Sequence, residues 1–354
     1  MGSFVFHVVS SVKGGCGKST FAFYLADYLS KNSDSVYLID LDTSGTSWLE
    51  DYDEYYDSET ASVFLNDIID DSKIHRKIEP WRHITRNPNR DRKWYDSFAG
   101  NPESVRLCIA DPERRKYTPE YQIDLFEQAV ASLIQNEILN QISNNDIHIV
   151  LDMPPGVEAK AEKIFRYWLP KKASESYLKG DQTRIKIKLY MLTNLSNASV
   201  SANWKYIRDL LAPRSYNDWF ARLMNEENAL SISMILNDIG GMFFKGQPEI
   251  ADKKIISGDM ILKQEGNLLT GKDEIVKQIM KKGCWCLAYI PKIECVHSRY
   301  THLKSITRKS ITSTGNIITT TNNVRPCFCK SKKGNLSGED GSMSELFDIL
   351  CYDR

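Results

Sequence analysis

Residues 4–30 read FVFHVVSSVKGGCGKSTFAFYLADYLS, and three patterns follow one another within them. The first seven residues are mostly apolar, aromatic or β-branched, which is typical of a strand buried on both faces. A glycine-rich turn comes next, and from Ser19 to about Lys31 apolar residues recur at helical spacing. A further apolar run, VYLID at residues 36–40, completes a predicted strand, helix and strand unit in which the two strands are parallel.

Predicted strands and helices continue to alternate beyond this unit. Further apolar runs that predict strands lie at residues 105–110, 148–152, 185–193, 230–236 and 286–290. A long amphipathic helix is predicted between about residues 119 and 143. Six or seven such strands with helices between them predict one α/β domain with a doubly wound, mostly parallel sheet. Ligands of such sheets bind at the carboxyl ends of the strands.

The composition excludes several classes of protein. The 354 residues are 42% hydrophobic and carry 46 basic and 46 acidic groups, which is typical of a globular chain with a sizeable core rather than a disordered one. No stretch reaches the roughly 18 to 20 consecutive apolar residues of a membrane span, and no signal-peptide pattern is present. The eight cysteines are not spaced as a small secreted disulfide framework. We therefore expect a cytoplasmic protein.

Charge is distributed unevenly along the chain. Residues 50–59 carry six acids, residues 73–93 carry eight bases and two acids, and residues 281–335 carry eleven bases and one acid. The first two runs interrupt the strand and helix rhythm, so we interpret about residues 48–103 as an insertion after the second strand. Either run alone is more typical of a solvated surface. The net charge of +10 over residues 281–335 would attract an anionic partner, unless it is simply solvated.

The turn at residues 13–20, KGGCGKST, has the composition of a phosphate-binding loop (P-loop). Glycines let backbone N–H groups surround phosphate oxygens, and the following helix adds the positive end of its dipole. Lys18 is placed to neutralise the β- and γ-phosphates, and Ser19 to bind Mg²⁺ through its hydroxyl. The other nucleotide-binding residues predicted in the loop are Gly14, Gly15, Cys16, Gly17 and Thr20. The usual signature has glycine where this chain has Val12, and Lys13 is an additional lysine.

The variant KGGxGK(S/T) resembles the deviant Walker A, or signature-lysine, P-loop ATPases. This family includes ParA partition proteins, MinD, the Mrp carriers, the nitrogenase iron protein and Get-type targeting factors. Asp40 and Asp42 in LIDLDTSGT resemble the DxD element of ParA proteins, and Asp152 in VLDMPPG resembles the Walker B acid. Asn237 in MILN resembles the asparagine that reads adenine, although asparagine is common after a strand. The resemblance covers about residues 1–47, 105–165 and 185–295.

The resemblance implies a mechanism with ATP and Mg²⁺ as cofactors. It places Asp40 and Asp152 with Ser19 at the metal, and Asp42 beside the attacking water. In this family the signature lysine, here Lys13, contacts the phosphates of the nucleotide in the opposite subunit, so that two copies enclose two ATP molecules. A lysine delivered across an interface stabilises the transition state only after dimerisation. We therefore expect a slow ATPase, producing ADP and phosphate, whose ATP-bound form is a homodimer.

We predict two parts in the chain. Residues 1–297 form the ParA/MinD-like ATPase domain, and residues 298–354 form a basic, polar extension that ends in an acidic C-terminal helix. That helix, SELFDILCYDR at residues 344–354, has acidic side chains that anionic lipid would repel. MinD-like membrane cycling is therefore disfavoured, and docking of the helix on the chain itself or on a partner is favoured.

The resemblance leaves three possibilities for what the switch acts upon. The first is DNA segregation, such as plasmid partition, or positioning, in which residues 281–335, joined by residues 73–93, contact non-specific DNA or a DNA-bound partner. The second is an accessory ATPase of a multi-protein machine that binds an adaptor or activator protein. The third is an Mrp-type metal or iron–sulfur carrier, with candidate ligands Cys284, Cys286, Cys295, His297, Cys327 and Cys329. Their CxC spacing differs from the CxxC of those carriers, and buried thiols are also ordinary core residues.

Overall fold

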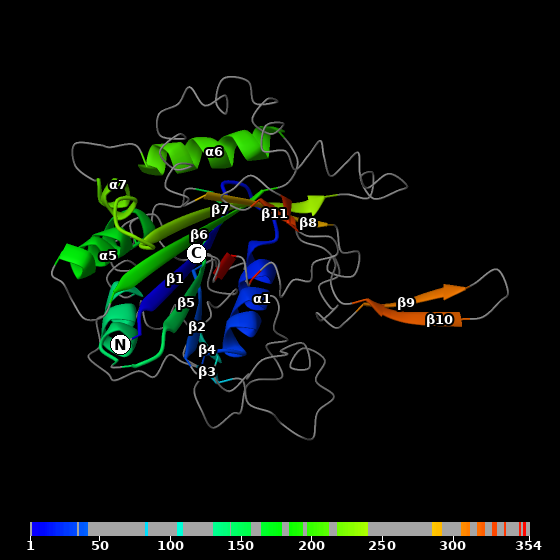
Figure 1. Cartoon of the computed structure of the whole chain (residues 1–354), viewed down its shortest axis with the longest axis horizontal. Helices are drawn as coiled ribbons and strands as arrows, with labels where there is room; N and C mark the ends of the chain where they lie inside the picture. The colour runs from blue at the N-terminus through cyan, green and yellow to red at the C-terminus, as the bar shows by residue number, and fades with distance from the viewer. Residues whose placement is uncertain are drawn as a thin grey trace, which may run out of the picture.

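Strands from distant parts of the chain assemble into one ten-stranded sheet in the computed structural model (Figure 1). The structure describes residues 2–33, 35–41, 82–83, 105–108, 130–141, 143–156, 164–178, 184–193, 197–211, 218–239, 285–291, 306–311, 317–322, 328–330, 336–337, 347 and 350–351. The order of the strands across the sheet is β12-β11-β8-β7-β6-β1-β5-β2-β4-β3.

Seven neighbouring strands of the described sheet are parallel. They are β1 (Phe4–Ser10), β2 (Val36–Asp40), β4 (Val105–Cys108), β5 (Ile147–Asp152), β6 (Ile185–Thr193), β7 (Leu230–Ile239) and β8 (Trp285–Pro291). Every residue of β1, β2 and β5 is buried, because helices cover both faces of the sheet. The predicted doubly wound, mostly parallel fold is confirmed, with β1 between β5 and β6.

Short antiparallel strands extend both edges of this sheet. β3 (Arg82–His83), from the predicted insertion, pairs with β4. β11 (Phe328–Lys330) and β12 (Leu336–Ser337), from the predicted extension, continue the sheet beyond β8. β9 (Ile306–Ile311) and β10 (Ile317–Asn322) pair with each other as a separate hairpin (Figure 1). The division of the chain at residue 297 remains a prediction.

Helices pack on both faces of the sheet, and each face has its own apolar cluster. α1 (Lys18–Ser30) covers one face, which we call the α1 face. The other face is covered by η7 (Ile134–Leu139), η8 (Ile164–Trp168), α5 (Leu169–Leu178), α6 (Asn197–Leu211) and α7 (Trp219–Leu223). η7 and η8 are π-helical. None of the described helices has both the length and the apolar character needed to cross a membrane.

The helix predicted to continue to residue 143 ends earlier. Its described part runs from Val130 through η7 and stops at Leu139. The Ser143 hydroxyl donates to the Asn145 carbonyl oxygen at 2.9 Å and accepts from the Asn145 N–H at 3.1 Å. Such a side-chain turn holds residues 143–145 outside the helix. The helix itself ends in a tight turn, in which the Gln141 N–H donates to the Ile138 carbonyl oxygen at 3.0 Å. Residues 119–129 of this prediction lie outside the described residues.

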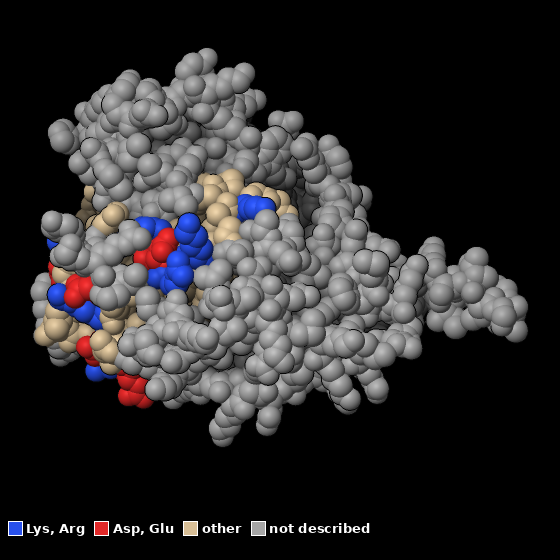
Figure 2. Space-filling view, turned by 90° about the horizontal axis from the view of Figure 1, so that it is seen from above, with Lys and Arg blue, Asp and Glu red and all other residues tan. Residues whose placement is uncertain are grey.

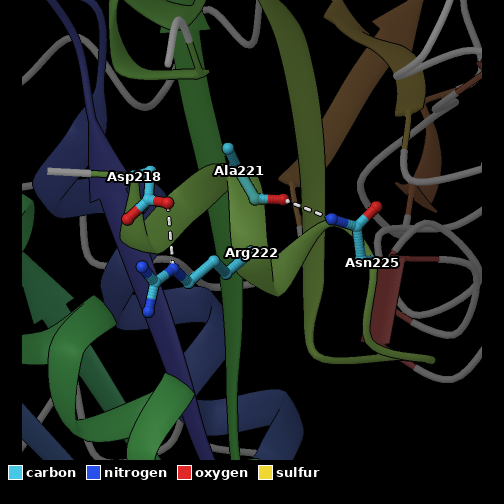
Figure 3. A network of polar contacts seen from close by, with 4 residues as sticks. All are labelled: Asp218, Ala221, Arg222 and Asn225. Atoms are coloured by element: carbon cyan, nitrogen blue, oxygen red, sulfur yellow. Dashed lines mark hydrogen bonds and ion pairs between the residues drawn. The ribbon is translucent and has the colours of Figure 1, made fainter. Parts of the chain in front are cut away.

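α7 is a five-residue helix with side-chain contacts near both ends (Figure 3). At its start the Arg222 Nε donates to the Asp218 carboxylate at 2.9 Å, which is an exposed ion pair one helical turn apart. At its end the Asn225 amide donates to the Ala221 carbonyl oxygen at 3.2 Å. Bonds of this kind satisfy backbone and charged groups that a short helix otherwise leaves to water. α7 packs against the core through its buried Phe220 and Leu223.

Residues near the C-terminus return to the α1 face. Phe347, Leu350 and Cys351 are helical and buried in the same apolar cluster as α1. The Phe347 ring lies with its centroid 5.3 Å from that of Phe21 and 5.3 Å from that of Tyr28, both on α1. This part of the chain therefore packs against the helix that follows the glycine-rich loop.

Candidate nucleotide-binding site

The loop between β1 and α1 has the backbone geometry of a phosphate cradle. Gly15 and Gly17 have φ of 72° and 82°, a region that side chains other than glycine rarely adopt. Gly17 caps α1, and its carbonyl oxygen accepts the first helical hydrogen bond, from the Phe21 N–H at 3.0 Å. The N–H groups of a helix's first turn have no acceptor within the helix and favour an anion. A Cβ placed on Gly15 would meet no atom within 4 Å, so the loop is open at that point.

The start of the loop is held by hydrogen bonds from three directions. The Ser11 hydroxyl donates to the Lys13 carbonyl oxygen at 2.9 Å, and the Lys13 N–H donates back to it at 3.3 Å. The Gly156 N–H, just beyond β5, donates to the Ser11 carbonyl oxygen at 3.0 Å. The Val12 N–H donates to the Asn203 side-chain oxygen at 2.7 Å. Contacts with the segment after β5 and with α6 therefore fix the position of the first residues of the loop.

The two lysines of the loop differ in exposure. Lys18, the first residue of α1, is buried, whereas Lys13 is exposed at the other end of the loop. Cys16 is buried and its thiol donates to the Gly14 carbonyl oxygen at 3.8 Å. Its predicted contact with a nucleotide would therefore be through its backbone. Ser19 is partly buried, and the side chain of Thr20 lies outside the described residues.

Two of the predicted metal ligands are neighbours at the carboxyl ends of adjacent strands. Asp40 ends β2 and Asp152 ends β5, and the two are register partners. Both are fully buried, and by the alternation of side chains they share the α1 face with Leu38 and Val150. Two carboxylates and the Ser19 hydroxyl are oxygen ligands of the kind that Mg²⁺ prefers. The residues present therefore fit a magnesium ion beside a bound nucleotide.

Two other predicted site residues are only partly placed. Asn237 lies near the end of β7, along the same edge of the sheet, with its side chain outside the described residues. Asp42 also lies outside the described residues. Their predicted roles remain predictions.

The structure adds a residue that the sequence analysis did not identify. Asn203, on α6, is fully buried and bonds the loop at Val12. Its signal in the sequence was an amide side chain on the apolar face of an amphipathic helix, where a polar group needs partners. The partner at Val12 is 191 residues away, so no local pattern could reveal it.

A buried polar network crosses the α1 face away from this loop. The His7 ring bonds the Tyr190 hydroxyl through Nδ1 and the His148 Nδ1 through Nε2, both at 3.0 Å, and the Cys351 thiol lies 3.7 Å from the Tyr190 hydroxyl. Burial lowers the pKa of His7 well below 6.5, and His148 and Lys188 lower it further. Burial also lowers the pKa of His148 to about 4, against an opposing effect of Asp146. Both histidines are therefore neutral at pH 7 and act as structural hydrogen-bonding groups.

The sheet, the glycine-rich loop and the paired carboxylates define a P-loop nucleotide-binding protein. Residues 7–298 match the family model of the CobQ/CobB/MinD/ParA nucleotide binding domain. The chain therefore belongs to this ParA/MinD-like family. The resemblance predicted from KGGCGKST is confirmed at the level of the family.

Several solved structures are similar to this chain at low sequence identity. A plasmid partition protein from Borrelia burgdorferi B31 bound to AMPPNP is 14% identical, with a TM-score of 0.41, over 84% of this chain and 90% of that one. A ParA family ATPase from Chlorobium tepidum is 19% identical, with a TM-score of 0.37, over 78% and 96%. An ATP complex of a McdA variant from Cyanothece is 14% identical, with a TM-score of 0.43, over 83% and 84%. A comparison with curated protein sequences found no match.

Proposed function

We propose that the chain is an ATP-dependent dimerisation switch with slow, Mg²⁺-dependent ATPase activity, and that it acts in DNA segregation or positioning. One observation carries the proposal: a buried lysine, Lys18, opens α1 on the face of the sheet where Asp40 and Asp152 end adjacent strands. A phosphate loop and two carboxylates at one sheet edge suit phosphoryl transfer, which depends on charge stabilisation and positioning.

Different residues of the described site would bind the phosphates and the metal ion. The N–H groups of the loop and of the first turn of α1 would surround the phosphates, and Lys18 would offset their charge. Ser19, Asp40 and Asp152 would hold Mg²⁺, which when bound supplies positive charge at the phosphate oxygens. Because Asp40 and Asp152 are buried, the attraction between a carboxylate there and a bound cation would act at low effective dielectric and would be strong. Asp42 keeps the role that the family resemblance implies, which is to orient the attacking water.

The exposure of Lys13 supports the proposed dimer. Its backbone is fixed by Ser11, yet its side chain is exposed, so it can reach a nucleotide held by a second subunit. Lys18 is buried and serves the nucleotide of its own chain. The ATP-bound dimer would persist until hydrolysis removes the γ-phosphate and its contacts.

The proposed DNA contact rests on the basic segment 281–335. Arg308 and Lys309 of this segment lie in β9, on the hairpin that Figure 1 draws away from the main sheet. The described residues visible in Figure 2 instead show basic and acidic side chains beside one another. A mixed surface of that kind does not attract a phosphate backbone as a basic segment does.

DNA binding in defined nucleotide states tests the function. The Asp42→Ala variant is used to hold the ATP state, and binding to non-specific duplex DNA is measured with ATP and with ADP at two salt concentrations. We expect binding that requires ATP and weakens steeply with salt, because phosphate contacts release counterions. Absence of DNA binding in both states, together with ATP-dependent capture of a protein partner, would instead support an accessory ATPase that uses an adaptor.

A second candidate function, metal or iron–sulfur carriage of the Mrp type, has one structural observation in its favour. Cys286 lies in β8 and Cys329 in β11, and these strands are neighbours in the sheet. Their side chains lie outside the described residues. Metal analysis of the purified protein, with Cys286→Ser and Cys329→Ser as comparisons, tests this alternative: bound zinc or iron that both substitutions remove would favour it.

A further inference from the structure

Asn203 uses both ends of its side-chain amide inside the core. Its Oδ1 accepts a hydrogen bond from the Val12 N–H at 2.7 Å, and its Nδ2 donates to the Leu192 carbonyl oxygen at 2.9 Å. The residue is fully buried. An N–H requires an acceptor and a carbonyl oxygen requires a donor, so the chemistry of the two partners fixes the orientation of the amide.

This arrangement joins three elements at one point. Val12 opens the loop after β1, Leu192 is close to the end of β6, and Asn203 belongs to α6. α6 packs on the face opposite α1, so Asn203 reaches the loop from behind, away from the side on which Asp40 and Asp152 lie. A second bond, from the Thr193 hydroxyl to the Ser199 hydroxyl at 2.9 Å, also ties α6 to the end of β6 but does not involve the loop.

The bond to Val12 determines where the phosphate-binding part of the loop begins. The Val12 N–H is directed to Asn203, and the Lys13 N–H is directed to Ser11. The first N–H that the loop can present to a phosphate therefore comes from Gly14. Val12 stands where the usual signature has glycine, so its backbone must be placed by contacts rather than by the freedom of a glycine.

We propose that Asn203 is a positioning residue for nucleotide binding, which holds the start of the P-loop against β6 and α6. The proposal rests on the proposed binding of ATP at this loop. Because the same amide contacts Val12 and Leu192, a change in the loop on nucleotide binding is transmitted directly to α6. The opposing possibility is that Asn203 only satisfies buried backbone groups and stabilises the fold.

Matched substitutions in α6 separate these possibilities. Asn203→Leu keeps the number and branching of the side-chain heavy atoms but removes both hydrogen bonds, and Asn203→Ala also removes the outer atoms of the side chain. Ser199→Ala is the control, because it removes a buried hydroxyl bond from the same helix to the same strand, and that bond does not involve the loop. For each protein, the ATP dissociation constant, the rise in Tm on adding ATP and Mg²⁺, and hydrogen exchange at Val12 are measured.

We expect both Asn203 variants to bind ATP about tenfold more weakly or worse, equivalent to about 1.4 kcal/mol. Their Val12 amide should exchange faster, whereas Ser199→Ala should keep wild-type affinity and wild-type exchange at Val12. Wild-type affinity in a folded Asn203 variant would overturn the proposal. So would loss of the folded state in both Asn203 variants, since the residue would then serve the fold alone. Failure of the wild-type chain to bind ATP would refute the proposed function itself, which is a distinct result.

Discussion

Replacing Phe347 by alanine should destabilise the protein substantially, although this residue is more than 300 positions from the helix that it contacts. Its side chain is 2% exposed and lies against the rings of Phe21 and Tyr28 on α1. Truncating a buried phenylalanine to alanine usually costs about 3–5 kcal/mol, including the cavity that it leaves. Because the short helical segment around Phe347 can partly collapse into that cavity, we expect the lower end of this range, about 3 kcal/mol.

Urea denaturation followed by circular dichroism provides the measurement, with the free energy of unfolding taken from the midpoint and slope. Leu178→Ala is the control, since Leu178 is 69% exposed and its truncation should change the free energy by less than about 0.5 kcal/mol. A loss of less than about 1 kcal/mol in Phe347→Ala would refute the docking of this segment on α1. An unchanged midpoint in both variants would mean that residues other than Phe347 cover the α1 face.

Three further predictions concern the site and the buried network. Lys18→Ala should abolish ATP binding or hydrolysis. Lys13→Ala should lose dimerisation and hydrolysis more than ATP binding, as measured by equilibrium binding and analytical ultracentrifugation. Full activity in the Lys13 variant would exclude a cross-subunit role. Asp42→Ala should bind ATP, fail to hydrolyse it and accumulate as a dimer; unchanged turnover would contradict the water-orienting role. The folded-state pKa of His148 is about 4 against 6.5 for an ordinary histidine, so between these values the unfolded chain binds the extra proton and stability falls as the pH falls. From pH 7 to pH 5 the free energy of unfolding in urea should fall by at least about 2 kcal/mol, because the shift of His148 alone accounts for about that amount and the lowered pKa of His7 adds to it; the fall should be smaller in His148→Gln. A pH-independent value would contradict the buried neutral histidines.

The central strands were predictable because of how they are buried. β1, β2 and β5 are covered on both faces, so each reads as one apolar run, and the carboxylates that end β2 and β5 could be expected to meet at one edge. The glycine positions followed from the chemistry of phosphate binding, and Gly15 and Gly17 do adopt positive φ. These features are local in sequence, or follow from parallel pairing alone.

Other features could not be predicted, because their cause is not local. β3, β11 and β12 are two or three residues long and form only because a neighbouring strand offers an edge. The role of Asn203 depends on a partner 191 residues away. η7 ends at Leu139 in a tight turn from Gln141 to Ile138, and a serine turn then holds residues 143–145 outside the helix. Hydrophobic periodicity alone does not specify where such turns replace the helix.

The packing of Phe347 on α1 also affects the order in which the protein can mature during synthesis. Phe21 and Tyr28 leave the ribosome early, while the side chain that covers them is translated more than 300 residues later. Until then the side of Phe21 and Tyr28 that Phe347 covers is left exposed, and exposed apolar surface of this kind favours aggregation. The nascent chain would then have to bind nucleotide through a helix that is not yet fully packed. A chain interrupted before residue 347 is therefore expected to retain the P-loop sequence but to hold its lysine on a less stable helix.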